Sequence, residues 1–465
     1  MMILESTYKA SEIKHLVSMQ KEFFQTGFTK TSNFRIEQLK KLYKSIVENE
    51  DEIKSALKKD LNKSDFEAYV TEIGFTLKEL SEAIKHLKKW MKPKKVKTPI
   101  THIGTKGYIY KEPYGVTLII SPWNYPFQLT MAPLIGAIIG GNTAIIKPSE
   151  LTPNTSIIIN KIINENFDKQ YIAVVDGGIE ESTILLQQKF HFIFFTGSVQ
   201  VGKIVMEAAS KNLTPLILEL GGKSPTIVHN DSNIQLAAKR IAWGKFTNAG
   251  QTCIAPDYIY VHKSVKKDFI KALKNEIVQF YSNKPLLNND YTKIISDRHF
   301  NRLVSFLNNG EILHGGEFDQ LSHKIEPTLI SDVSWDSPIM SEEIFGPILP
   351  ILTYENMDEV INEINQHPKP LALYVFTENK QIAQKVIERV PFGGGCVNDT
   401  LYHMANPNLP FGGVGESGSG NYHGEYSFAA FTHDKSVLLQ TTKIDLKIRY
   451  HTTKNALRLI RKLLK

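Results

Sequence analysis

Short apolar runs separated by helix-length segments are the feature that most constrains how this chain can fold. The runs lie at residues 116–120, 143–146, 171–175, 192–195 and 215–220. Parallel strands of one sheet must be joined by crossover connections of about a dozen residues or more, and these spacings accommodate such connections. We therefore expect an α/β protein with a doubly wound, Rossmann-like sheet in this part of the chain.

A second α/β set is expected after Gly221-Gly222, with strands at residues 225–228, 258–261, 349–352 and 371–376. Ahead of the first set, apolar residues recur at every third or fourth position among lysines and glutamates in residues 36–61 and 73–87, which is typical of amphipathic helices. Pro93 and Pro99 break this pattern and indicate a linker. At 465 residues the chain exceeds what one core usually supports, so two domains are expected, with a boundary near the paired glycines.

The net charge of +7 is concentrated at the C-terminal end. Residues 446–465 contain no Asp or Glu, and their basic residues are Lys447, Arg449, Lys454, Arg458, Arg461, Lys462 and Lys465. These residues account for the whole net charge, so residues 1–445 are formally neutral. A general nucleic-acid-binding surface is therefore not expected.

The basic tail has the pattern of an amphipathic helix. Leu457, Ile460 and Leu464 can share one helical face, with basic residues around it. Such a helix can lie on an anionic membrane surface, which would place the protein on the inner face of a membrane. A tail that packs on its own dimer or stays disordered is the equal alternative.

Cysteine usage and the absence of long apolar segments indicate a cytoplasmic protein. Cys253 and Cys396 are too few for a disulfide framework and lack zinc-site spacing, so no metal site is expected. Charged residues such as Glu5 interrupt the first thirty residues, which leaves no continuous hydrophobic region for a secretory signal. Cys396 follows three glycines, has no acid or base beside it, and is expected to be structural.

Two segments are candidates for binding a dinucleotide. In residues 195–202 an apolar strand leads through Gly197 and Ser198 into a helical stretch that contains Gly202, and helix N-termini favour phosphate. The GxGxxG pattern is absent, so an ordinary strand-to-helix turn is the alternative. Lys147 and Glu150 end the preceding strand at the expected ligand-binding edge, although a surface loop would look the same.

Three residues are candidates for chemistry. Cys253 follows a glycine-containing loop at residues 248–252, whereas most free cysteines are buried and inert. Glu219 lies inside an apolar strand, where burial raises a carboxyl pKa toward the range useful to a base; a partnered structural Glu is the alternative. Asn124 follows a strand and offers an amide that can stabilise an oxyanion, unless it only forms a turn.

Together these segments resemble the aldehyde dehydrogenase superfamily, in order from the N-terminal helices to about residue 435. The resemblance rests on Trp123-Asn124-Tyr125-Pro126-Phe127, Lys147-Pro148-Ser149-Glu150, Phe195-Thr196-Gly197-Ser198, Glu219-Leu220-Gly221-Gly222-Lys223-Ser224-Pro225, Gly250-Gln251-Thr252-Cys253, Glu343-Ile344-Phe345-Gly346-Pro347 and Leu409-Pro410-Phe411-Gly412-Gly413-Val414-Gly415. Residues 241–246, 255–258 and 422–424 look most like the class 3, dimeric branch. The resemblance therefore implies a homodimer.

The resemblance also implies residue roles. Cys253 would be the nucleophile, the Asn124 amide and the Cys253 main-chain N–H the oxyanion hole, and Glu219 the base that activates water. The residues that would contact the cofactor are Lys147, Glu150, Gly197, Ser198, Gly202, Glu343 and Phe345. A Glu near the adenosine ribose favours NAD, and the branch often accepts NADP as well, so NAD is expected first with NADP as a second possibility.

The implied fold is the aldehyde dehydrogenase fold, with three parts. Residues 1–97 and 112–218 would form a Rossmann-like cofactor domain and residues 219–424 an α/β catalytic domain. Residues 98–111 and 425–446 would form a small β bridging or oligomerisation arm, followed by the basic tail at 447–465.

The expected substrate is an uncharged, apolar aliphatic or aromatic aldehyde, oxidised to its acid through a cysteine thiohemiacetal and thioester. No Arg flanks Cys253, and Tyr125, Phe127, Tyr402 and Met404 could supply apolar lining. Two alternatives stay open: a CoA-acylating dehydrogenase, which needs the same thiol, and a catalytically silent structural or binding homologue.

Overall fold

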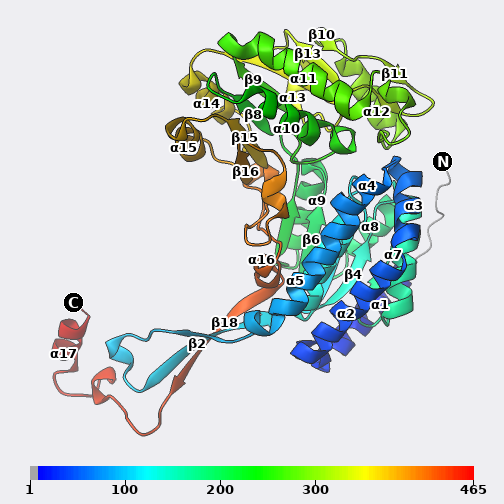
Figure 1. The fold of residues 1–465 in the computed structure, drawn as a ribbon. Coiled ribbons are helices and arrows are strands. Elements are labelled where there is room, and N and C mark those ends of the chain that lie inside the picture. The colour runs from blue at the N-terminus through cyan, green and yellow to red at the C-terminus, as the bar shows by residue number, and fades with distance from the viewer. Residues whose placement is uncertain (1–8, 465) are drawn as a thin grey trace.

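The computed structural model describes residues 9–464 and shows two sheet-based lobes with an arm that projects from the lower one (Figure 1). The first eight residues of the predicted cofactor segment 1–97, which include Glu5, lie outside the described residues. Lys465, the last residue of the predicted basic tail, also lies outside them.

The lower lobe contains a six-stranded sheet with the order β17-β7-β6-β3-β4-β5. Its strands are β3 (Val116–Ile120), β4 (Thr143–Lys147), β5 (Ile172–Val174), β6 (Phe192–Thr196), β7 (Leu216–Glu219) and β17 (Gly418–Ser419). Strands β3 to β7 pair in parallel, which confirms the predicted doubly wound sheet. The short β17 was not predicted, and it pairs antiparallel with β7.

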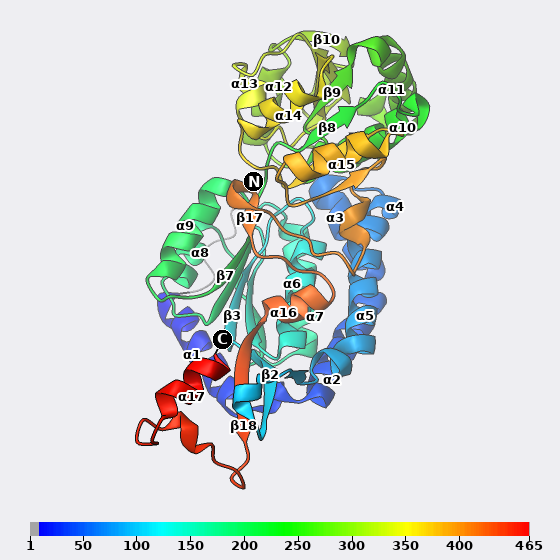
Figure 2. The ribbon, with the colours of Figure 1, turned by 90° about the vertical axis from the view of Figure 1, so that its left-hand side faces the viewer.

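Helices cover both faces of this sheet. On one face lie α1 (Ala10–Gln25), α8 (Ile179–Leu186) and α9 (Val199–Ser210); on the other lie α2 (Ser32–Glu48), α3 (Glu50–Leu61), α5 (Gly74–Trp90), α6 (Gln128–Gly140) and α7 (Pro153–Asn166) (Figure 2). Alternate strand residues enter different cores: Leu118 packs with the α1 side and Ile119 with the α6 side. Burial on both faces explains why these strands are continuous apolar runs.

The predicted helical stretch at residues 36–61 forms two helices. They separate at Asn49, and Asn62 ends α3 in the left-handed conformation. The short helix α4 (Asp65–Ala68) then leads into a π-helical turn, Tyr69–Ile73, before α5 begins. The sequence pattern did not indicate this π-helical turn.

The upper lobe contains a seven-stranded sheet with the order β10-β13-β14-β9-β8-β15-β16. Its strands are β8 (Pro225–Val228), β9 (Tyr258–His262), β10 (Glu311–His314), β13 (Thr328–Ser331), β14 (Ile348–Tyr354), β15 (Ala372–Phe376) and β16 (Gly394–Val397). The four predicted strands are present, whereas β10, β13 and β16 were not predicted. The helices are α10 (Ile234–Phe246), α11 (Lys266–Tyr281), α12 (Asp297–Phe306), α13 (Pro338–Ser341), α14 (Met357–Asn365) and α15 (Lys380–Arg389), and β11 (Phe318–Asp319) pairs with β12 (Lys324–Ile325).

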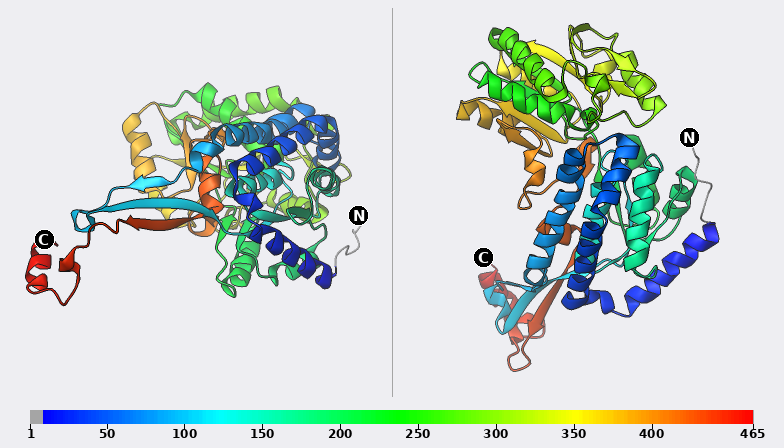
Figure 3. Two further views of the ribbon diagram at one scale, coloured as in Figure 1. Left: turned by 90° about the horizontal axis from the view of Figure 1, so that it is seen from below. Right: turned by 45° about the vertical axis from the view of Figure 1, so that its right-hand side comes forward.

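The projecting arm is a three-stranded antiparallel sheet that extends away from the body (Figure 3). Its strands are β1 (Lys94–Val96), β2 (Thr105–Pro113) and β18 (Thr432–Gln440). The linker predicted after Pro93 is therefore wrong, because Lys94–Val96 pairs with β2. Residues 425–430, which were predicted to belong to the arm, form α16 (Glu425–Ala430) instead, and its Phe428 is buried in the main core.

The chain ends in the short helix α17 (Ala456–Leu463), beyond the arm (Figure 1). Its Leu457 and the following Leu464 are exposed, whereas Ala456 is buried. Among residues 9–464, no helix is both long and apolar enough to cross a membrane.

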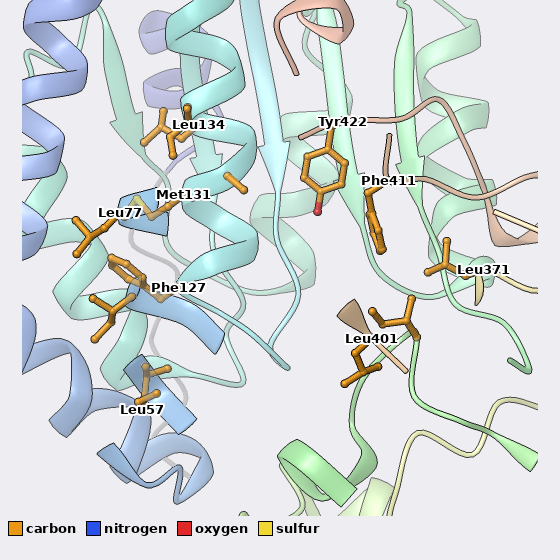
Figure 4. Packing of buried hydrophobic residues seen from close by; sticks show 14 of the residues in the cluster. Leu57, Leu77, Phe127, Met131, Leu134, Leu371, Leu401, Phe411 and Tyr422 are labelled. Carbon is orange, nitrogen blue, oxygen red and sulfur yellow. The ribbon is translucent and has the colours of Figure 1, made fainter. Parts of the chain in front are cut away.

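One continuous core connects the N-terminal helices to the segment that follows the upper sheet. Figure 4 shows Phe127, Met131 and Leu134 at α6 on one side and Phe411, Tyr422 and Leu401 on the other. This core places the loop after β3 beside segments that lie almost 300 residues later in the chain.

Candidate active site

The candidate active site begins where the parallel strands of the six-stranded sheet end. Ile120 is level with Lys147 of β4, and Thr196 is level with Glu219 of β7. Because the carboxyl ends of parallel strands meet at one edge, the loops that follow these strands lie together. Ligands bind at this edge in open α/β sheets.

A cavity of about 390 Å³ opens at this edge, against the upper lobe. Seven of the residues predicted for the site line it: Asn124, Gly197, Ser198, Glu219, Cys253, Glu343 and Phe345. They come from the loops after β3 and β6, from the last residue of β7, from the loop between α10 and β9, and from the segment before β14. The tertiary structure therefore brings together residues that are up to about 220 positions apart in sequence.

The other three predicted cofactor residues lie outside the lining of this cavity. Lys147 is buried at the end of β4, where its Nζ donates to the Pro148 carbonyl (2.8 Å) and pairs with the exposed Glu150 (3.2 Å). Gly202 lies in the first turn of α9, where an added Cβ would meet Leu220 at 2.6 Å. Gly202 therefore allows close packing between helix and strand and offers no surface to the cavity.

The loop before Cys253 has an unusual backbone. Asn248 and Ala249 have φ angles of 54° and 50°, and Gly250 follows at 73°. A Cβ at Gly250 would lie 2.3 Å from the Gly346 carbonyl oxygen. Non-glycine residues in this region persist only where surrounding contacts fix them, and such strain clusters at functional sites.

Cys253 is partly buried at the base of the cavity. Burial raises the pKa of its thiol, and the nearby carboxylates of Glu343 and Glu219 raise it further; main-chain N–H groups of Cys253 and Ile254 oppose this effect by hydrogen bonding to the sulfur. At neutral pH the thiol is therefore protonated, and it needs a base before it can react as a thiolate.

Glu219 is the candidate base. Its side chain is 3% exposed, and neither carboxyl oxygen has a hydrogen-bond partner among residues 9–464. Burial raises the pKa of this carboxyl well above its ordinary value. A carboxylate with free lone pairs and a raised pKa is a stronger base than an ordinary glutamate, so it is suited to accept a proton.

The segment that carries Glu343 and Phe345 is held by four side chains. Arg302 donates to the Glu343 and Ile344 carbonyls, and His299 Nε2 lies 2.7 Å from the Phe345 carbonyl. Lys223 donates to the Glu342 carbonyl (2.9 Å), and Asp257 accepts from the Ile344 N–H (2.9 Å). None of these four residues was predicted to act in the site: Arg302 and His299 lie outside the recognised motifs, and Lys223 and Asp257 lie within motifs without an assigned role.

Glu343 itself reaches into the cavity over a glycine. A Cβ at Gly221 would lie 1.9 Å from Glu343 Oε2, so only glycine permits this approach. Burial, together with the charge of Asp257, raises the pKa of Glu343 to about 8. Phe345 stands edge-on to Trp123 across the same cavity, with ring centroids 5.3 Å apart.

The first cavity, called the polar cavity below because charged side chains line it, fits a dinucleotide. Thr196 Oγ1 is buried at the end of β6 with no hydrogen-bond partner among the described residues, and Thr196 lines the cavity, so this hydroxyl is free to bind a ligand. Gly197 and Ser198 precede α9, whose N-terminus favours phosphate, and Gly221 leaves room at the Glu343 side. These groups suit phosphates and ribose hydroxyls.

A second cavity, of about 190 Å³, meets the first at Cys253. No Asp, Glu, Lys or Arg of the described part of the chain lines it, and its lining includes the predicted residues Tyr125, Tyr402 and Met404. Phe127 does not line it, because its side chain is fully buried in the core beside α6. Cys253 therefore lies between a polar cavity and an apolar one.

Cys396 lies in β16, and its sulfur is 3.6 Å from His403 Nδ1. It is absent from the lining of both cavities.

Comparison with known proteins agrees with this architecture. The aldehyde dehydrogenase family profile matches residues 5–437. The chain is 56% identical to the 4,4'-diaponeurosporen-aldehyde dehydrogenase of Staphylococcus aureus, over 91% of this chain and 93% of that protein. It is 43% identical to the mouse dimeric NADP-preferring aldehyde dehydrogenase, over 93% of this chain and 96% of that protein.

Solved structures show the same fold. A substrate-bound state of Staphylococcus aureus AldH matches with a TM-score of 0.95 and 53% identity, over 97% of this chain and 99% of that one. An NAD⁺ complex of aldehyde dehydrogenase from Bacillus cereus matches with a TM-score of 0.85 and 26% identity, over 93% and 89%. The chain therefore belongs to the aldehyde dehydrogenase family, in its class 3-like branch, and is an NAD(P)-dependent oxidoreductase that acts on aldehydes.

Proposed function

We propose that the protein oxidises an uncharged aliphatic or aromatic aldehyde with an apolar chain to its carboxylic acid, through a thioester on Cys253. The observation that carries this proposal is the position of Cys253 in the lining of both cavities. On one side of Cys253 lie Glu219, Glu343 and the loop before α9. On the other side lies the second cavity, called the apolar tunnel below, which no charged side chain among residues 9–464 lines. An aldehyde carbon at the sulfur would thus have its chain in the tunnel.

Formation of the tetrahedral adduct requires a thiolate and an oxyanion site. Glu219 accepts the thiol proton, because its raised pKa and unpartnered oxygens make it the available base. The sulfur then bonds to the aldehyde carbon, and the carbonyl π electrons move to oxygen. Asn124 Nδ2 uses one of its N–H groups on the Gln251 carbonyl (3.0 Å), which leaves the second for the oxyanion together with the Cys253 main-chain N–H.

NAD(P), when bound, supplies the hydride acceptor for this reaction. Collapse of the thiohemiacetal expels hydride from carbon and leaves a thioester on Cys253. Glu219, after its proton has passed to solvent, takes a proton from water, and the hydroxide attacks the thioester carbon. The C–S bond breaks and releases the carboxylic acid, and the proton on Glu219 passes to the sulfur, which restores the thiol and the Glu219 carboxylate for another turnover.

The cofactor would be held along the sheet edge. Lys147, Glu150, Gly197 and Ser198 would bind its adenosine and pyrophosphate part, and Glu343 and Phe345 its nicotinamide-ribose part. Gly202 contributes through the close packing of α9. We propose NAD as the preferred cofactor, because the exposed Glu150 carboxylate would repel a 2′-phosphate, with NADP accepted as a weaker alternative.

The remaining assignments are proposals about assembly and location. Apart from Lys94–Val96 and residues 112–113, which belong to the arm, residues 1–97 and 112–218 would act as the cofactor domain and 219–424 as the catalytic domain, with the projecting sheet as the contact of a homodimer. We propose a cytoplasmic protein that touches the inner face of a membrane through α17, whose exposed leucines lie among basic residues. No nucleic-acid partner is proposed.

The test is NAD(P)H formation with a panel of alkyl, aryl and carboxylate-bearing aldehydes, with and without CoA. The proposal expects activity without CoA, preference for uncharged apolar aldehydes, and acid as the product. A strict requirement for CoA would establish the acylating alternative and overturn hydrolysis. Faster turnover of charged aldehydes would overturn the assignment of the apolar tunnel.

A further inference from the structure

A fully buried ion pair lies behind the loop that carries Asn124. Lys63, just after α3, and Glu72, in the π-helical turn, are 2.5 Å apart, and neither side chain is exposed. Taking two charges out of water costs as much as their attraction returns in many proteins, so such a pair is weak evidence for stability. Its contacts indicate a different role.

The two charges hold both ends of one short segment. Lys63 Nζ donates to the Asn124 carbonyl at 3.0 Å and lies 4.0 Å from the centre of the Tyr125 ring. Glu72 Oε2 accepts from the N–H groups of Phe127 (2.8 Å) and Gln128 (3.2 Å). The backbone on either side of the Asn124 amide is therefore tied to the N-terminal helices.

The same carbonyl also joins this segment to the loop before Cys253. Asn248 Nδ2 donates to the Asn124 carbonyl (2.8 Å) and to the Gln251 carbonyl (3.0 Å), which the Asn124 amide also contacts. The Asn248 N–H in turn donates to Glu67 Oε1 (2.8 Å). Asn248 has a positive φ angle, so this loop depends on outside contacts for its shape.

We infer that Lys63, Glu72 and Glu67 are positioning residues that fix the Asn124 amide relative to the Cys253 sulfur. None of the three lines either cavity, so they act through Asn124 and Asn248 and do not touch the substrate. A displacement of about 1 Å in a reacting group can cost about 10²-fold in rate. The inference rests on the roles proposed above for Asn124 and Cys253.

The test is a double-mutant cycle on the full-length protein with Lys63→Met and Asn124→Ala. Alone, Lys63→Met is expected to lower kcat about tenfold or more, with the loss of about 10²–10³-fold for complete removal of an oxyanion donor as the upper limit. In the Asn124→Ala background the same change is expected to alter kcat less than about twofold, because its target is gone. The KM for NAD is expected to stay unchanged, since the pair lies away from the cofactor cavity.

Two further variants separate positioning from folding. Lys63→Met leaves Glu72 buried without its partner, so Lys63→Met/Glu72→Gln removes both charges and keeps an acceptor for the Phe127 and Gln128 N–H groups. This double variant is expected to fold and still show the loss in kcat. Arg35→Met is the matched control: Arg35 is a buried cation on α2 that binds the Thr29 and Ile139 carbonyls, away from the site.

Each outcome decides a separate point. Normal kcat in Lys63→Met/Glu72→Gln, an equal loss in both backgrounds, or an equal loss in Arg35→Met would overturn the positioning role. Wild-type kcat in Asn124→Ala would instead overturn the proposed oxyanion role, and the inference would fall with it. Activity is normalised to folded protein, with Tm recorded for every variant.

Discussion

The side-chain amide of Asn124 donates a 3.0 Å hydrogen bond to the main-chain carbonyl of Gln251, two residues before Cys253. This bond joins the loop after β3 of the lower sheet to the loop before β9 of the upper one. It fixes the positions of the loops that carry Asn124 and Cys253, and in the proposed mechanism both residues act on the carbonyl group of the aldehyde. The geometry of the site therefore depends on the contact between the lobes.

Removal of the Cys253 thiol is expected to abolish aldehyde oxidation. Cys253→Ala should reduce turnover by at least about 10³-fold, because no other thiol lines the cavities. Cys396→Ala is the matched control and should retain near-wild-type kcat, since Cys396 lies in β16 and lines neither cavity. NAD(P)H absorbance measures both; activity that survives in Cys253→Ala would refute the nucleophile.

Glu219→Gln is expected to lower activity and, at pH 8, to raise thermal stability. Turnover should fall about 10²-fold or more through loss of the base. The raised pKa of the buried Glu219 means that the folded state binds its proton more tightly than the unfolded state does. The stability that this carboxyl contributes is therefore present below its pKa in the unfolded state and is lost as the pH rises through its pKa in the folded state. Glu219→Gln cannot ionise, so it should have a higher Tm than the wild type at pH 8. Calorimetry at pH 5 and pH 8 measures the Tm of both proteins. A Tm difference between variant and wild type that is the same at the two pH values would contradict this prediction.

His299 is expected to make the protein less stable in mild acid. Burial, together with Arg302, lowers the pKa of its imidazole from 6.5 to about 4. The unfolded state then binds more protons between these values, so stability is complete above about pH 6.5 and falls as pH drops toward 4. His299→Gln keeps a donor for the Phe345 carbonyl. Between pH 7.5 and 5, the free energy of unfolding of this variant should fall by about 1–2 kcal/mol less than that of the wild type. Urea unfolding measures the difference, with the exposed His102→Gln as the control.

A bulky residue in the apolar cavity is expected to change substrate range. Ala405→Trp should raise the KM for long-chain aldehydes about tenfold or more and leave that for propanal nearly unchanged, because Ala405 lines this cavity and not the polar one. Leu321→Trp is the control, since Leu321 is 97% exposed. Equal effects on short and long aldehydes would rule out this cavity as the chain-binding tunnel.

The C-terminal helix is expected to bind anionic membranes. Full-length protein should co-sediment with vesicles that contain phosphatidylserine, and deletion of residues 452–465 should remove this binding. Each basic residue near such a surface contributes about 1 kcal/mol, so Arg458→Gln/Arg461→Gln/Lys462→Gln should weaken binding on the order of 10²-fold. Pure phosphatidylcholine vesicles are the control; no binding by the full-length protein, or unchanged binding after deletion, would sink the membrane proposal.

Several elements were predictable because their signals are local. The strand β4 is an apolar run because both of its faces are buried, and α5 shows its amphipathic period directly. By contrast, β17 has two residues and β1 has three, so each depends on its pairing partner: β17 pairs with the distant β7, and β1 pairs with the next strand, β2. No local pattern marks such strands. Phe127 illustrates the same limit, since its sequence neighbours suggested the substrate cavity but its ring points into the core.

The fold class, the family and the available chemical groups could be predicted from the sequence, because apolar periodicity and the motifs around Asn124, Glu219 and Cys253 are formed by consecutive residues. Which of these groups face one another depends on the tertiary structure. It places Glu343 over Gly221, leaves both Glu219 carboxyl oxygens without a hydrogen-bond partner among residues 9–464, and sets the Lys63–Glu72 pair behind Asn124. These relationships depend on packing between segments far apart in the chain, where burial and proximity set pKa and geometry, and no local pattern encodes them.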